Sequence, residues 1–441
     1  MNSTMKRKAA PAFILSFGIG ITHLLAGSQY AIAQDSDSEI EELKEQMRAL
    51  QLQIEEMKKN QTEADKPRKM EADNVVTGGD IPGSFKLPGS NTSVKIGGYI
   101  KFDAIYDLNQ DLGDTLFVDG LDVSNEDSNS SFRAHARQSR LYLKTSTPTS
   151  LGNATTYIEG DFFGGGGNEV FSNSSGFRLR HAYGELAGLL AGQTWSNFMH
   201  FAAYPTTVDF DGPVGVSFIR QGQLRYTLPA GPGELSLSAE NPEGTGFEDA
   251  RDTSPDVTAR YHWNGENTEV ETAAVVRRLK TDSPAASSDD STFGYGLMLA
   301  GNVDVTDSTR LMAGVMYGDG IGRYIYTANG VEDGEDSIGA AYINAGGELE
   351  TIEAYGFNVA VTQQWTDKFS SGLSFGQVRG DRPADLFPTS TRTLQSIHFS
   401  NFYQWSEPVT LGFEISNGFK ELQNRDSENN TRLQLSAKYT F

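Results

Sequence analysis

The chain has 441 residues, including 47 glycines and no cysteine, and a formal net charge of −22 at pH 7. This acidity argues against a nucleic-acid partner, because phosphates require a basic protein face. Disulfides cannot hold the fold together, and after the N-terminal segment no stretch approaches the roughly 18 apolar residues of a membrane-spanning helix. Any membrane crossing by the mature chain must therefore use strands.

The N-terminus is typical of a secretory signal peptide. A positive MKRK segment precedes the apolar run AFILSFGIGITHLLAG, and AIA supplies the small residues of a cleavage site. We expect cleavage after Ala33, so that Gln34 starts the mature chain. The alternative is an uncleaved membrane anchor, which the small residues Ala31 and Ala33 disfavour. We therefore assign residues 1–33 as a signal peptide and expect the protein to be exported.

Residues 34–63 carry a heptad pattern. Apolar residues recur at alternating spacings of three and four, with charged and amide residues between them. The predicted coiled-coil core positions are Ile40, Leu43, Met47, Leu50, Ile54 and Met57. An oligomeric coiled coil is the favoured interpretation, and a single amphipathic helix lying on a domain is the alternative. Residues 64–91 contain three prolines among glycines, so we expect a linker there.

From Thr92 to the C-terminus, apolar and polar residues alternate as they do in strands. In SVKIGGYIKFDAIY, for example, Ile100 and Phe102 share one face and Lys101 lies on the other. Short connections alternate with long ones rich in Gly, Asp, Asn and Ser, as in up-and-down outer-membrane barrels. We therefore predict an all-β fold. It consists of an antiparallel transmembrane β-barrel of about 16 strands over residues 92–441, preceded by a short coiled-coil helix.

The strands of a soluble β-sandwich would show the same alternation of apolar and polar residues. This alternation alone therefore does not distinguish a sandwich from a membrane barrel. The leader, the alternating loop lengths and an array of about 350 residues favour the membrane barrel. Because lysine or arginine on the lipid face costs roughly 2–4 kcal/mol, charged strand residues must face the lumen. The final segment, TRLQLSAKYTF, should pair with the first strand to close the barrel. Its terminal aromatic, Phe441, resembles the signal that such barrels present to the assembly machinery.

The third long connection, SNFMHFAAYPTTVDFDGPVGVSF, is more apolar than its neighbours. A loop that stays in water has no need of so many aromatic residues. Barrels of this size enclose an aqueous channel rather than a packed core, so an inward loop would narrow that channel. We expect this loop to fold inward and to carry Asp209 and Asp211 to the constriction. The alternative is a loop that lies over the top of the barrel or on a neighbouring subunit.

Three segments place arginines on the predicted lumen wall: FRAHARQSRLYLK, FRLRHAYGEL and IRQGQLRYTL. The candidate pore-lining residues are Arg133, Arg137, Arg140, Arg178, Arg180, Arg220 and Arg225. Arg140 does not share the face of Arg133 and Arg137, which requires a bulge or a strand-end position. Arginines without acidic partners would favour small anions. Arginines paired with acids such as Glu159 and Asp161 would instead act as scaffolding.

Several segments together make the chain similar to the DcaP-like porins. They are IPGSFKLPGSNTSVKIGGYIKFDAIYD, ARQSRLYLKT, YIEGDFFGGGG, LRHAYGEL and LLAGQTWSNF, along with the leader and the coiled coil. The resemblance implies a trimeric diffusion channel in the lipid and lipopolysaccharide of a Gram-negative outer membrane, with the coiled coil in the periplasm. It also implies small anionic solutes, dicarboxylates among them. A more distant likeness is to phosphate-selective porins, whose full ladders of arginine and lysine this chain does not show.

Other functions find little support in the sequence. An enzyme barrel would need a nucleophile with histidine and acidic partners. The five histidines of the mature chain, His135, His181, His200, His262 and His398, lie in no recognisable nucleophile motif, and no metal-ligand spacing is present. A structural or adhesive barrel would have a plugged lumen, and no plug-sized domain precedes the strands. We therefore predict a passive channel for small hydrophilic solutes with a preference for small anions, with no catalytic residue, metal or cofactor.

Overall fold

The computed structural model describes residues 36–64, 76–124, 129–166, 170–243, 247, 249–286, 290–328 and 337–441. The chain divides into two compact units, Met1–Ala72 and Asp73–Phe441. The predicted signal peptide and the first part of the predicted linker lie outside the described residues. No helix in the described ranges is long and apolar enough to span a membrane.

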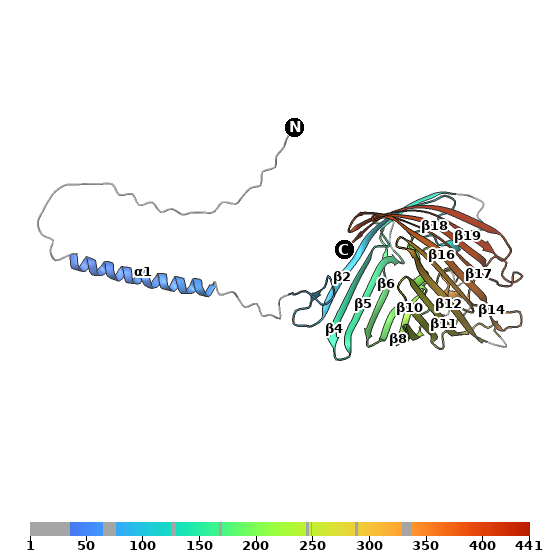
Figure 1. Ribbon diagram of the computed structural model, residues 1–441, viewed down its shortest axis with the longest axis horizontal. Coiled ribbons are helices and arrows are strands. Elements are labelled where there is room, and N and C mark those ends of the chain that lie inside the picture. The colour runs from blue at the N-terminus through green and yellow to red at the C-terminus, as the bar shows by residue number, and fades with distance from the viewer. Residues whose placement is uncertain are drawn as a thin grey trace, which may run out of the picture. The chain divides into compact units, whose positions relative to one another are not determined.

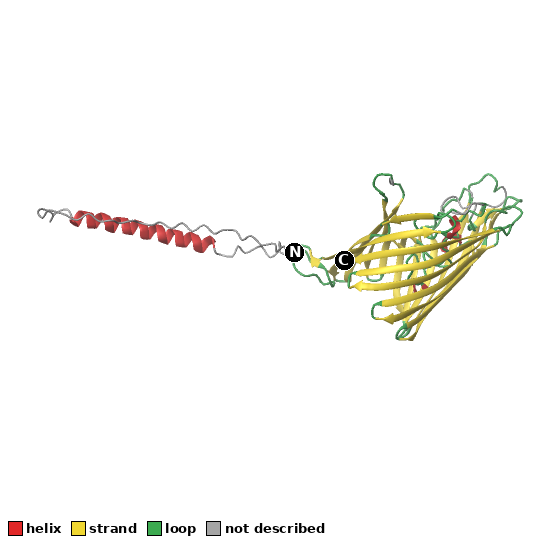
Figure 2. Cartoon of the chain, turned by 90° about the horizontal axis from the view of Figure 1, so that it is seen from above, coloured by secondary structure: helices red, strands yellow, loops and turns green. Residues whose placement is uncertain are grey.

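The described residues of the first unit form one helix, α1, which spans Ser36–Ala64 and is drawn in red in Figure 2. The helix predicted within residues 34–63 is therefore confirmed. Four of its predicted core residues have exposed side chains within the single chain, namely Met47, Leu50, Ile54 and Met57. The side chains of Ile40 and Leu43 lie outside the described part of the chain. An exposed apolar seam is what a partner helix would cover in a coiled coil, and that pairing stays a prediction.

The second unit is a closed antiparallel barrel of sixteen wall strands, as predicted (Figure 1). The wall strands are β2 (Ser93–Asp107), β3 (Ser131–His135) continued by β4 (Arg140–Thr149), β5 (Gly152–Gly164), β6 (Gly176–Leu186), β7 (Leu189–Trp195), β8 (Arg220–Ala230), β9 (Gly233–Glu240), β10 (Asp256–Asn264), β11 (Thr268–Lys280), β12 (Ser291–Thr306), β13 (Thr309–Asp319), β16 (Glu353–Thr366), β17 (Phe369–Gly380), β18 (Thr391–Ser406), β19 (Val409–Leu422) and β20 (Ser427–Thr440). The short strand β1 (Phe85–Lys86) pairs with the start of β2, and β14 (Ala341–Ile343) pairs with β15 (Leu349–Thr351) in a separate hairpin.

The last strand closes the barrel against the first one, as the sequence predicts. Strand β20 pairs with β2 in a register that runs from Tyr99↔Thr440 to Asp107↔Arg432. The backbones of Phe441 and Gly98 add two more hydrogen bonds, of 3.1 and 3.2 Å. The wall therefore has no unpaired edge between its first and last strands, as a barrel in lipid requires. The role of Phe441 in barrel assembly stays a prediction.

The residues of the wall are arranged in the opposite way to those of a soluble barrel. On β20, Leu435 and Tyr439 are 57% and 51% exposed on the outer face, whereas Arg432 and Gln434 are 0% and 2% exposed on the inner face. Strand β2 shows the same alternation. Apolar side chains therefore face outward and charged ones inward, which suits a barrel surrounded by lipid.

The lumen is partly filled, and this differs from the sequence-based expectation of a water-filled barrel with one inward loop. Three long connections fold into it: residues 108–121, residues 196–219, and the described parts of 320–352. Their apolar side chains form one core with the inner wall; its loop members include Leu116, Val118, Leu121, Phe198, Val214, Ile219, Ile321, Tyr324 and Ile325. This internal core leaves only part of the lumen open.

Glycines on the inner wall make room for these loops. A Cβ atom at Gly376 of β17 would overlap the carbonyl oxygen of Val214, and one at Gly412 of β19 would lie 2.9 Å from the Val208 side chain. Real Cβ atoms essentially never approach other heavy atoms to less than 3.0 Å. The missing side chains therefore let the loop lie directly against the wall.

Candidate channel constriction

The loop of residues 196–219 is attached to one arc of the barrel wall. Two loop amides donate to wall side chains: Val208 N to Glu414 Oε2 at 2.7 Å and Val214 N to Ser396 Oγ at 3.0 Å. In the other direction, Lys101 Nζ donates to the Val208 carbonyl at 2.7 Å. At the turn of residues 202–203, the Ala202 amide donates to Glu271, and the side-chain amides of Asn302 and Asn358 donate to the loop carbonyls. These contacts fix the loop inside the barrel and leave the arc of β3 to β8 facing the open side.

The two aspartates predicted at the constriction lie on this loop, but both are buried. Asp209 accepts from Arg432 Nη1 at 3.3 Å and from the Leu116 amide at 2.9 Å, and it is 2% exposed. Asp211 is 4% exposed, and its amide donates to Asp209 Oδ1 at 3.0 Å. Burial, reinforced by the neighbouring Asp209 carboxylate, raises the pKa of Asp211 to about 6. The structure thus places these carboxylates where they anchor the loop.

Three of the predicted lining arginines are paired with acids on the neighbouring strand. Arg178 makes two hydrogen bonds to Asp161, of 2.9 and 2.8 Å. Arg180 reaches Glu159 at 2.7 Å and Asp161 at 3.0 Å. Arg140 lies 3.4 Å from Glu159. These pairs match the scaffolding interpretation of the basic wall, because Glu159 and Asp161 offset two of the three positive charges.

Arg133 and Arg137 lie nearer the long loops and are paired with Asp114, and Arg133 also with Asp111. Between β3 and β4, residues 136–139 lie opposite residues 100–102 of β2, so the β3–β4 side carries one extra residue. This is the bulge that the parity of Arg140 requires.

Arg220 and Arg225 differ from the other lining arginines. In the part of the chain that the structure describes, no ion pair joins either of them to a carboxylate. The Arg220 guanidinium lies 4.5 Å from the Trp195 ring centre and 5.3 Å from that of Phe218, and its Nη1 has no hydrogen-bond partner among the described residues. Arg225 donates to Gln223 Oε1 and to the Trp195 carbonyl, both neutral acceptors. Among the described residues, neither guanidinium therefore has a carboxylate within ion-pair distance.

Two cavities lie on either side of the Arg220–Trp195 contact. The entrance cavity, of about 590 Å³, is lined by Arg220 and by long-loop residues such as Asp114 and Tyr326. The exit cavity, of about 550 Å³, is lined by Trp195 and by residues near the short turns, such as Gly188. Arg220 and Trp195 thus mark the boundary between the two sides of the channel.

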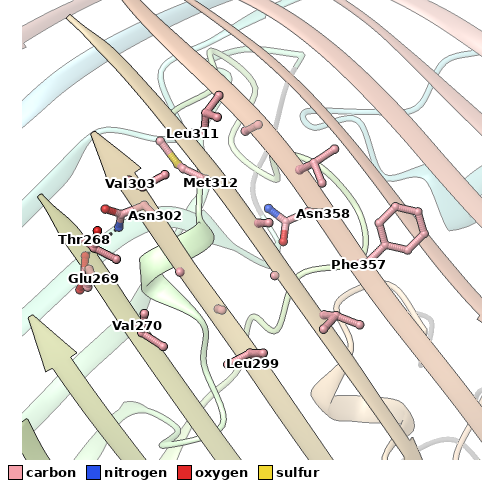
Figure 3. Close-up of a pocket in the computed structure, with 17 residues that line it drawn as sticks. Thr268, Glu269, Val270, Leu299, Asn302, Val303, Leu311, Met312, Phe357 and Asn358 are labelled. Carbon is pink, nitrogen blue, oxygen red and sulfur yellow. Dashed lines mark hydrogen bonds between the residues drawn. The ribbon is translucent and has the colours of Figure 1, made fainter. Parts of the chain in front are cut away.

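A third cavity, of about 790 Å³, is a groove over β11, β12, β13 and β16 (Figure 3). Its exposed lining side chains, among them Leu299, Leu311 and Val359, occupy outward-facing positions. The small residues Gly301 and Ala313 are cross-strand partners at its centre. This groove belongs to the apolar outer surface and is no part of the solute path. Among the described residues, no cluster of histidine and acidic side chains could hold a metal ion.

The sequence analysis did not identify the aromatic residues at the constriction or the basic residues at the two cavities. Trp195, Phe163 and Phe218 lie beside the arginines, and Arg323 and Arg260 line the entrance and exit cavities respectively. Trp195 is the last residue of β7 and pairs directly with Arg220 of β8. The register of the β7–β8 pair is the signal that could have brought the two residues together.

Comparison with known proteins identifies the family. The porin subfamily matches residues 82–420. The outer membrane channel DcaP of Acinetobacter baumannii is 26% identical, with a TM-score of 0.71, and the match covers 83% of this chain and 100% of that one. Porin Omp2b of Brucella abortus (strain 2308) is 29% identical over 192 residues, 42% of this chain and 47% of the relative. Porin Omp2b of Brucella suis is 28% identical over 162 residues, 36% of this chain and 40% of the relative.

The chain thus spans less than half the length of these curated relatives. An anion-selective porin from Comamonas acidovorans shares the fold at 12% identity and a TM-score of 0.52, over 79% of this chain and 100% of that one. The family match, however, extends over well more than half of the chain. The chain therefore belongs to the porin subfamily.

Proposed function

We propose that this channel conducts small hydrophilic solutes passively and prefers small anions, dicarboxylates among them. The observation that carries the proposal is the guanidinium of Arg220, which makes no ion pair among the described residues and lies at the boundary between the two cavities. A cation in a narrow, partly desolvated passage attracts anions, and a guanidinium suits carboxylates because it can donate two parallel hydrogen bonds. The similarity to the A. baumannii DcaP channel supports the same assignment.

The acidic composition of the chain is compatible with this preference. Several of its carboxylates at the lumen are neutralised, since Glu159 and Asp161 pair with the wall arginines and Asp209 pairs with Arg432. Much of the remaining acid lies in the long loops. The selectivity of a channel depends on the charges at its narrowest part rather than on net charge.

We further propose that the channel is a homotrimer whose α1 helices form a periplasmic coiled coil, after export by the signal peptide. The exposed seam of Met47, Leu50 and Met57 supports helix pairing. On the outer face of the barrel, Thr145 and Thr156 share a 2.7 Å hydrogen bond between their hydroxyls. A polar pair at this position suits contact with a neighbouring subunit better than contact with lipid chains.

The zero-current potential across a planar bilayer under a KCl gradient tests the anion preference. We expect a chloride-preferring potential for the natural protein. We expect Arg220→Gln to lower the chloride-to-potassium permeability ratio about fivefold, since one charge–charge interaction of ~1 kcal/mol is lost. A trimer should close in three conductance steps.

The matched control is Arg425→Gln, which removes the same charge from a side chain that is 62% exposed on the short turn between β19 and β20. This variant should leave the permeability ratio unchanged, because exposed charges are screened by salt. A potassium-preferring potential in the natural protein, or equal ratios for both variants, would contradict the proposal.

A further inference from the structure

A continuous row of aromatic rings crosses the constriction. On the entrance side, the ring centre of Phe163 lies 4.7 Å from that of Phe210, and Phe210 lies 6.1 Å from Phe218. Phe218 is then 4.8 Å from Trp195, in an edge-to-face arrangement. Since Phe218 lines the entrance cavity and Trp195 lines the exit cavity, this contact carries the row past Arg220.

The row continues along the inner wall toward the short turns. Trp195 lies 5.5 Å from His181, and His181 lies 5.9 Å from Tyr157. Tyr157 in turn lies 5.6 Å from Tyr142, with nearly parallel rings, and 5.8 Å from Tyr183 of the exit cavity. We name these residues the aromatic track: Phe163, Phe210, Phe218, Trp195, His181, Tyr157, Tyr142 and Tyr183.

The aromatic track faces the open side of the lumen. Phe163, Phe210, Phe218 and Trp195 are all partly exposed, and His181 is a buried link between them and the tyrosines. Phe198, which lies in the loop of residues 196–219 with Phe210 and Phe218, is 0% exposed and belongs to the internal apolar core. The loop therefore uses one set of aromatic residues for packing and leaves another set accessible to solutes.

Guanidinium groups accompany the track. Arg178 lies 5.3 Å from the Phe163 ring centre, and Arg220 lies 4.5 Å from that of Trp195. Arg180 is 5.9 Å from Trp195. A solute at Trp195 can therefore place a carboxylate near Arg220 while a flat part of the solute contacts an aromatic face.

We propose that the aromatic track makes this channel selective for carboxylates that carry a ring with a flat apolar face, either a sugar ring or an aromatic ring. The proposal rests on the anion preference proposed above and names the solute class within it. The ring of a solute can stack on one aromatic side chain after another without breaking hydrogen bonds at each step. It can therefore move along the row of side chains. An open-chain carboxylate of the same charge gains only the interaction with arginine.

Block of the ion current in planar bilayers, measured with the full-length protein, tests the proposal. The probes are glucuronate, which is a cyclic sugar acid, benzoate, which is an aromatic acid, and gluconate, an open-chain acid of equal charge. We expect at least one ring-bearing acid to bind about tenfold more tightly than gluconate, as one stacking contact provides. The comparison of glucuronate with benzoate shows whether the channel prefers a sugar ring or an aromatic ring. Equal affinities for all three acids would overturn the proposal.

Variants locate the effect on the track. Phe210→Leu should weaken binding of the ring-bearing acid about tenfold and leave gluconate binding unchanged, and Trp195→Leu should weaken binding of the ring-bearing acid more than that of gluconate. Phe210→Leu keeps the Arg220–Trp195 contact, so it separates stacking from any displacement of the arginine. The control Trp405→Leu changes a tryptophan that is 65% exposed on the outer face, and it should alter neither affinity.

Resistance of each variant to SDS at room temperature shows that the barrel has folded. A ring preference that survives both track variants would overturn the proposal. A potassium-preferring zero-current potential would instead reject the anion preference itself. The two failures are therefore distinguishable.

Discussion

Replacing Arg432 with methionine is expected to lower the free energy of unfolding by about 3–5 kcal/mol. It should also release the loop of residues 196–219, which we call the constriction loop. Arg432 is 0% exposed and makes two hydrogen bonds of 2.8 Å to Asp107 on the first strand. It also reaches Asp209 of the constriction loop at 3.3 Å and the Gly113 carbonyl at 3.0 Å. Methionine preserves much of the volume but leaves two buried carboxylates without their cation.

Urea unfolding of the barrel in lipid vesicles, followed by tryptophan fluorescence, measures the loss of stability, and single-channel recording should show a larger or less steady conductance. Arg425→Met is the matched control, since Arg425 is exposed and its pair with Glu421 contributes less than about 1 kcal/mol. If Arg432→Met unfolded at the same urea concentration as the control, the buried arginine would not be stabilising the contacts that join β20 to β2 and to the constriction loop.

The barrel was predictable because strand alternation and turn spacing are local properties of the sequence. A residue such as Leu435 can be assigned to the outer face from its immediate neighbours alone. The inward folding of residues 108–121 and 320–328 was not predictable in this way. Their apolar residues, such as Val118 and Ile321, are scattered among polar ones without a period, and they become buried only by meeting each other across the lumen.

The candidate site was predictable in part for the same reason. Parity places Arg178 and Arg225 on the lumen side of their strands, but it does not say which of them has an acidic partner. Asp161 lies directly across from Arg178 because a register shift follows Glu159 in the β5–β6 pair. Such a shift depends on the tertiary contacts of both strands, so the sequence left the paired and unpaired arginines unresolved.

Glycine patterns on the wall were an overlooked signal. In SSGLSFGQVRG of β17, glycines recur on the inner face at Gly372, Gly376 and Gly380. Glycine weakens a strand unless another group approaches it closely. Such a pattern at lumen-facing positions indicates that a loop lies against that wall, and the structure places Val214 against Gly376 and Ile338 against Gly380.

A single methyl group at Gly376 is therefore expected to displace the constriction loop. The Cβ atom of Gly376→Ala would overlap the Val214 carbonyl oxygen, so either the loop or the wall must move, at a cost of about 1–3 kcal/mol. We expect the loop to move, because the wall strand is held by both neighbouring strands. Single-channel conductance and anion preference should both change, while the barrel keeps its resistance to SDS at room temperature.

Gly372→Ala is the matched control on the same strand and the same face. Its Cβ atom would lie 3.7 Å from the nearest atom, the Thr206 carbonyl oxygen, which is an ordinary van der Waals contact. This variant should conduct like the natural protein. If both variants conducted like it, the hydrogen bonds from Val208 to Glu414 and from Val214 to Ser396 would be sufficient to position the loop. A change in Gly376→Ala alone would show that the space left by one missing side chain sets the width of the channel.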